Sequence, residues 1–62
     1  MSMKSGDLVT LDPEIYVREK GYVGKLLERA PAHFGERWIV LIKGRVHPYY
    51  VDGRDMEVIS ET

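Results

Sequence analysis

Side chains suited to catalysis are few and scattered in this 62-residue sequence. His33 and His47 lie far apart and the chain has no cysteine, so a metal site requires carboxylates from elsewhere in the sequence. The serines stand near the termini, outside the strand–turn–helix setting of a catalytic nucleophile, and residues 21–25 lack the spacing of a phosphate-binding loop. We therefore predict a protein that is not an enzyme, with no catalytic residues, no metal site, no cofactor and no small-molecule substrate.

Apolar side chains point instead to contacts with other proteins. Residues 38–42 are apolar without interruption, and neighbouring residues on a strand face opposite sides of a sheet, so one core cannot bury all five. Residues 8–9, 26–27 and 58–59 form similar apolar pairs. Three arrangements account for this pattern: the long loops fold over the outer surface, a bulge turns the pairs inward, or the surface contacts a partner or a second copy.

The candidate partner-binding residues are amphipathic aromatics, which are enriched at interface hot spots, and two members of the apolar run. They are Tyr16, Trp38, Ile39, Leu41, Tyr49 and Tyr50. We expect half of the four aromatics to fill the core or the ends of the barrel, and, if the fold brings them together, Tyr16, Trp38 and Tyr50 to share a groove.

Positive charge is concentrated in the middle of the chain, although the net charge is -1. The candidate nucleic-acid-binding residues of this segment are Arg18, Lys20, Lys25, Arg37, Lys43 and Arg45. The chain has no asparagine or glutamine, the side chains that read adenine edges, so base-specific recognition is not expected. Either these charges form one patch, or distant strands mix the signs and leave a solvated surface.

Turn-forming residues at nearly regular spacing divide the chain into five expected strands. These cover residues 7–12, 22–29, 37–43, 45–51 and 56–60. Gly24 inside the second strand predicts a bulge or a close backbone approach, and Pro48 places the fourth strand at an edge or a bulge. We expect one domain over 6–60, a disordered N-terminus or cloning remnant over 1–5, and a tail at 61–62.

Four short motifs carry a resemblance to a known fold. They are Gly6-Asp7-Leu8-Val9, Gly21-Tyr22-Val23-Gly24-Lys25-Leu26, Trp38-Ile39-Val40-Leu41 and Met56-Glu57-Val58-Ile59. Their order resembles the Src-homology-3-like small β-barrel superfamily, whose pattern is shared by phage, translation and photosystem-accessory barrels. The resemblance implies an all-β, five-stranded small barrel with two long loops, here 13–20 and 30–36, on one side, and a short turn, here 52–55, before the last strand.

The proline-peptide-binding branch of that superfamily is matched only in part. Trp38 and residues 48–51 resemble the aromatic positions of its groove. Residues 9–12 stand where its tyrosine-containing motif occurs, and its second tryptophan is missing, so polyproline recognition is not expected.

These features predict a small, non-catalytic binding or assembly module, with a protein partner or self-association. A nucleic-acid-binding barrel is the alternative, and an accessory subunit of a larger enzyme or photosynthetic complex is the second alternative. The sequence has no apolar run long enough to span a bilayer, so we expect no membrane partner and a cytoplasmic protein or a component of a virion or complex, with a phage origin among the possibilities.

Overall fold

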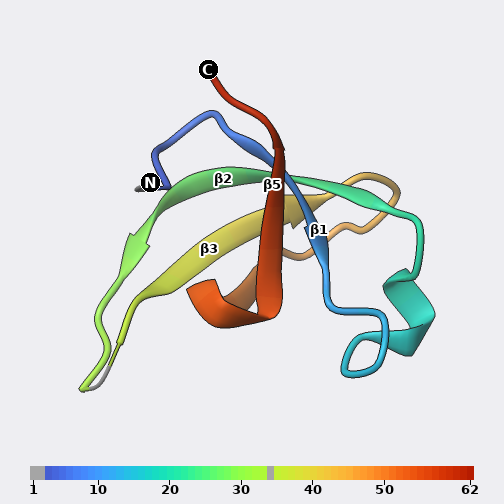
Figure 1. Cartoon of the computed structure of the whole chain (residues 1–62), viewed down its shortest axis with the longest axis horizontal. Helices are drawn as coiled ribbons and strands as arrows, with labels where there is room; N and C mark the ends of the chain where they lie inside the picture. The colour runs from blue at the N-terminus through green and yellow to red at the C-terminus, as the bar shows by residue number, and fades with distance from the viewer. Residues whose placement is uncertain (1–2, 34) are drawn as a thin grey trace.

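Five short segments, most of them rich in β-branched and aromatic residues, form one antiparallel sheet in this computed structural model, which describes residues 3–33 and 35–62 (Figure 1). The strands are β1 (Leu8–Leu11), β2 (Val23–Ala30), β3 (Arg37–Ile42), β4 (Tyr49–Asp52) and β5 (Met56–Ser60). Their order across the sheet is β4-β3-β2-β1-β5. Two short 3-10 turns, η1 (Val17–Glu19) and η2 (Gly53–Asp55), lie in the first long loop and between the last two strands. The all-β prediction is thus confirmed. The strand pairing runs from β4 to β5, and within the described residues β4 and β5 do not pair to close the sheet into a barrel.

One face of the sheet supplies the core because buried residues alternate with exposed ones along the central strands. Its buried members are Val9, Leu11, Leu26, Trp38, Val40, Ile42 and Val51. Gly24 permits close packing here, since a Cβ at this position would stand 2.6 Å from Val40 Cγ1 and 2.8 Å from Ile42 Cδ1. The predicted close approach at Gly24 is confirmed.

The fourth strand starts later than predicted. The sequence interpretation placed a strand at 45–51, whereas β4 begins at Tyr49. Gly44 turns the chain with a φ of +88°, which favours glycine, and Pro48 has no N–H to donate to the sheet. Residues 45–48 therefore form an exposed loop. The other strand boundaries agree with the prediction to within one residue, and those of β5 agree at both ends.

The two ends of the described chain meet at Asp7, a buried acid that immediately precedes β1. Its carboxylate accepts hydrogen bonds from the backbone N–H of Lys4 (3.1 Å) and of Thr62 (2.9 Å). The Ser5 hydroxyl donates to the Leu27 carbonyl (2.8 Å), so residues 4–5 are bonded to the sheet. Positions 1–2 lie outside the described residues.

No helical turn in the described part of the chain has the length and apolar character needed to cross a bilayer.

Candidate protein-binding surface

The face of the sheet opposite the core carries exposed apolar side chains on adjacent strands. Tyr50 is paired with Ile39, and Leu41 is paired with Lys25, which is paired in turn with Leu8. Tyr50 is 63% exposed, Leu41 42% and Leu8 37%. We call this surface the outer face and define it by Leu8, Lys25, Glu28, Ile39, Leu41 and Tyr50. Two of the candidate residues, Ile39 and Leu41, therefore lie outside the core, as expected for an apolar run that one core cannot bury completely.

A bulge in β2 determines which charges join the outer face. Lys25 and Glu28 are three residues apart, so a regular strand would place them on opposite faces. The register shifts between Leu26 and Glu28, with Lys25 paired to Leu41 and Glu28 to Ile39. Because Leu41 and Ile39 are two residues apart on β3, Lys25 and Glu28 lie on the same face. The sequence interpretation offered a bulge at Gly24, or a bulge that turns apolar pairs such as 26–27 inward. The register places a bulge at this pair, although Leu27 remains 40% exposed.

A shallow depression of about 260 Å³ lies on this side of the sheet. It is lined by Leu8, Val23, Gly24, Lys25, Leu41 and Lys43. Its lining combines aliphatic side chains with two lysines, neither of which forms an ion pair within the described residues. The outer face therefore carries its two charged residues, Lys25 and Glu28, on β2, with apolar side chains on the strands at either side.

The predicted groove of Tyr16, Trp38 and Tyr50 is not formed. Trp38 is only 4% exposed, because its register opposite Val51 turns it into the core. Its indole N–H donates to Glu36 Oε2 at 2.7 Å, and the Arg29 guanidinium carbon lies 6.0 Å from its ring centroid. Since Tyr50 precedes the core residue Val51, it faces the opposite side of the sheet. Trp38 is therefore a core residue, while Tyr50 belongs to the outer face.

The other two candidate aromatics, Tyr16 and Tyr49, pack together on the core side. Their ring centroids are 6.5 Å apart and both side chains are half-buried. The Tyr49 hydroxyl donates to Glu19 Oε2 at 2.9 Å, and Arg45 Nη2 lies 3.3 Å from the same oxygen. The hydrogen bond to Glu19, followed by burial, raises the pKa of Tyr49, and burial raises the pKa of Tyr16. These residues hold the first long loop against the sheet and are structural.

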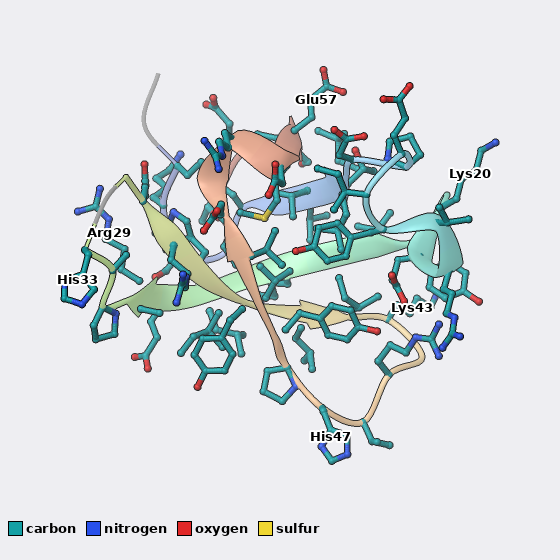
Figure 2. All side chains as sticks on the ribbon, turned by 90° about the horizontal axis from the view of Figure 1, so that it is seen from below. Lys20, Arg29, His33, Lys43, His47 and Glu57 are labelled. Atoms are coloured by element: carbon teal, nitrogen blue, oxygen red, sulfur yellow. The ribbon has the colours of Figure 1, made fainter. Side chains whose placement is uncertain are left out.

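The six candidate nucleic-acid-binding residues do not form one patch. Lys25 lies on the outer face, and Arg37 pairs with Asp52 at 3.5 Å. The other four, Arg18, Lys20, Lys43 and Arg45, gather at the end of the molecule where η1 meets the turn after β3, as Figure 2 shows for Lys20 and Lys43. Of the two arrangements that the sequence left open for segment 18–45, the structure therefore favours charges spread over the surface, because β2 carries the chain across the sheet between its two ends.

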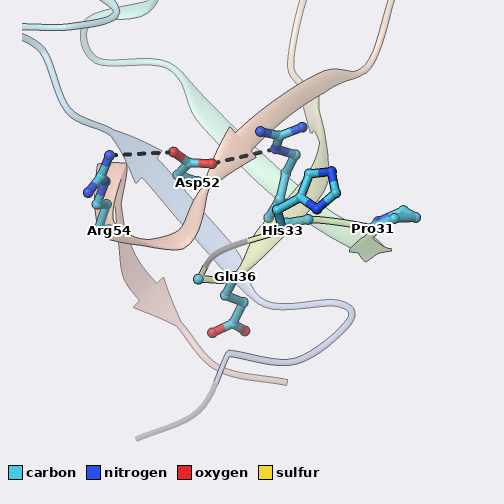
Figure 3. Close-up of a pocket in the computed structure, with 8 residues that line it drawn as sticks. Pro31, His33, Glu36, Asp52 and Arg54 are labelled. Carbon is cyan, nitrogen blue, oxygen red and sulfur yellow. Dashed lines mark ion pairs between the residues drawn. The ribbon is translucent and has the colours of Figure 1, made fainter.

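A second, wider depression of about 810 Å³ lies beside the loop between β2 and β3 (Figure 3). Asp52 pairs there with Arg37 at 3.5 Å and with Arg54 at 3.9 Å, while Glu36 pairs with Arg29 at 3.2 Å. Its acids and arginines neutralise one another, so it offers little net charge to a ligand.

The two histidines lie in different loops. Figure 2 shows His33 at one end of the molecule and His47 in the loop before β4. Within residues 3–33 and 35–62, no three histidine, aspartate or glutamate side chains come together to hold a metal ion.

Comparison with protein-family models, with curated proteins and with solved structures finds no match for this chain.

Proposed function

We propose that this chain is a small, non-catalytic binding module of the Src-homology-3-like small-barrel type, and that it binds protein through its outer face. Three features support the fold. The five antiparallel strands and the short turn η2 directly before the last strand agree with what the sequence resemblance implies. The long first loop, with η1 inside it, agrees as well.

The observation that carries the function is the exposure of apolar side chains at paired positions on neighbouring strands. Isolated exposed apolar residues are normal, whereas a contiguous apolar patch on a small protein marks a contact site. Here Tyr50 and Ile39 form one cross-strand pair, and Leu41 lies two residues farther along β3 on the same face. Neither long loop covers Leu41 or Tyr50, which remain 42% and 63% exposed.

Site-specific photo-crosslinking tests this function even though the partner is unidentified. A photoreactive phenylalanine derivative replaces Leu41 on the outer face or, as a matched control, Ile15, an exposed apolar residue of the first loop. In cells that express the chain, we expect a discrete protein adduct from position 41 and none from position 15. The Leu41→Asp variant of the purified chain should then lose binding to the identified protein. The absence of any protein adduct at position 41 would contradict the proposal.

A second candidate, binding of single-stranded nucleic acid, rests on the basic end formed by Arg18, Lys20, Lys43 and Arg45. The Arg45 guanidinium carbon lies 5.7 Å from the ring centroid of Tyr22, which is exposed and available for base stacking. Arg45 is already paired with Glu19, which leaves three cations for phosphates.

Fluorescence anisotropy with a labelled oligonucleotide tests this candidate. Binding should weaken between about 50 and 200 mM salt, and Lys20→Glu and Lys43→Glu should each weaken it further. Arg54→Glu, at a distant exposed position, is the control. No binding at either salt concentration would exclude the candidate.

A further inference from the structure

We propose that the partner of the outer face is a second copy of this chain, docked outer face to outer face about a twofold axis that crosses β2 between Lys25 and Glu28. This inference rests on the proposed function of the outer face. In this arrangement Lys25 of each copy meets Glu28 of the other, and Leu41 of each copy meets Ile39 of the other.

The strand register makes four residues of the outer face complementary to themselves. We call these four residues, Lys25, Glu28, Ile39 and Leu41, the central patch. One cross-strand row contains Lys25 and Leu41, and the next contains Glu28 and Ile39. Consider a twofold axis that lies in the plane of the interface and runs between these two rows. Rotation about this axis places the Lys25–Leu41 row of each copy opposite the Glu28–Ile39 row of the other. The operation brings the cation onto the anion and one aliphatic side chain onto the other. All four contacts of the central patch are therefore satisfied by a single symmetry operation.

The charges on this patch lack partners within the described part of the chain. Neither Lys25 nor Glu28 forms an ion pair there, although other acids and bases of the molecule do. An unrelated partner would have to supply both an acid and a base at a matching spacing, beside an apolar surface that meets Ile39 and Leu41. A second copy supplies them automatically, and a net charge of -1 on each copy opposes the approach only weakly.

The shape and size of the molecule set the expected strength. Stacked sheets pack about 10 Å apart with their strands within roughly 30° of each other, so two sheet faces of this kind can dock. The molecule measures 26 × 24 × 21 Å, so one face offers an interface at the lower end of the size range of stable complexes. We expect a dimer whose dissociation constant is micromolar or weaker.

Charge exchange tests the arrangement by sedimentation velocity over a concentration series from roughly 1 µM to 1 mM. The wild-type chain should dimerise as its concentration rises. Lys25→Glu and Glu28→Lys each place like charges opposite each other at two symmetric positions, so each should raise the dissociation constant at least about tenfold. The double variant Lys25→Glu/Glu28→Lys restores both pairs and should restore dimerisation. Lys20→Glu and Glu57→Lys, which change exposed charges outside the patch, are the matched controls.

Each outcome bears on the proposal. Circular dichroism confirms that each variant is folded, and restoration in the double variant cannot result from loss of folding in either single one. A wild-type chain that stays monomeric at all concentrations, or a dimer indifferent to both single changes, overturns this inference. The proposed function fails separately, when position 41 crosslinks to no protein at all. A position-41 adduct with a different protein and a monomeric wild-type chain together overturn only the second-copy inference.

Discussion

The Tyr49 hydroxyl donates a 2.9 Å hydrogen bond to Glu19 Oε2, which joins β4 to the first long loop across 30 residues of sequence. Glu19 is buried, and its Oε2 also accepts a hydrogen bond from Arg45 Nη2 at 3.3 Å. A buried carboxylate is costly unless its oxygens have partners, so this contact decides whether the loop stays docked.

Glu19→Ala should lower the free energy of unfolding by about 2 kcal/mol, because it removes the acceptor of the half-buried Tyr49 hydroxyl and the partner of Arg45. Chemical denaturation followed by circular dichroism measures this change. Glu14→Ala, which alters an exposed acid in the same loop, should change the free energy by less than about 0.5 kcal/mol. Equal stability of the two variants would show that the Glu19 contact does not hold the loop.

Stability should also fall at high pH because of Tyr49. The hydrogen bond to Glu19 raises its pKa above 10, so the folded state favours the neutral phenol. Because the folded-state pKa is raised, the hydrogen bond contributes fully to stability when the pH is below the unfolded-state pKa of about 10. This contribution is lost as the pH rises from about 10 through the folded-state pKa. Denaturation series between pH 8 and 12 should therefore show a smaller loss of stability in Tyr49→Phe than in the wild type. Identical slopes would contradict the assignment.

Asp7 gives the opposite dependence, at low pH. The hydrogen bond from the backbone N–H of Thr62 has the largest effect on the pKa of Asp7 and lowers it. Burial opposes this shift, and Lys4 adds to it, so the pKa lies below the ordinary value of 3.8. A lowered folded-state pKa means that its contribution is present above pH 3.8 and is lost as the pH falls through the folded-state value. Asp7→Asn should be less stable than the wild type at pH 7 and should lose less stability on acidification. Glu57→Gln, an exposed acid on β5, should behave as the wild type in the same titration.

Local patterns in the sequence were sufficient to predict the strands and part of the candidate site. The five apolar residues at 38–42 predicted that β3 is apolar on both faces, and Ile39 and Leu41 lie outside the core as that argument requires. Turn residues predicted five strands, although Pro48 was included in a strand that starts after it.

Features that depend on distant partners could not be predicted in this way. Alternation alone does not say which face of β3 meets the core, so Trp38 was placed in a groove although it is buried opposite Val51. The bulge that brings Lys25 and Glu28 together arises from the pairing of β2 with β3. Asp7 is buried, and Thr62, 55 residues away, donates a hydrogen bond to it; no local spacing encodes that contact.

Gly24→Ala should lower the free energy of unfolding by about 2 kcal/mol through overpacking of the core. The added Cβ would stand 2.6 Å from Val40 Cγ1, so combining it with Val40→Ala should relieve about 1 kcal/mol relative to the sum of the two single effects. Gly53→Ala is the matched control, since a Cβ at position 53 would meet no atom closer than the Glu36 carbonyl oxygen, at 3.5 Å. A double-mutant cycle by urea denaturation measures the coupling, and strict additivity would contradict the proposed clash.

Trp38 and Tyr50 should separate folding from binding. Trp38→Ala empties part of the core and leaves Glu36 without its indole donor, so we expect a loss of about 4 kcal/mol. A domain of this size has a total stability of only roughly 3–9 kcal/mol, so this variant should be largely unfolded or melt far below the wild type in circular dichroism.

Tyr50→Ala removes an exposed ring, so its melting should change little. Because Tyr50 belongs to the outer face, the same variant should weaken dimerisation or binding of the position-41 partner. A Tyr50→Ala chain that melts as the wild type and binds equally well would exclude Tyr50 from the interface, whereas a well-folded Trp38→Ala chain would contradict the place of Trp38 in the core.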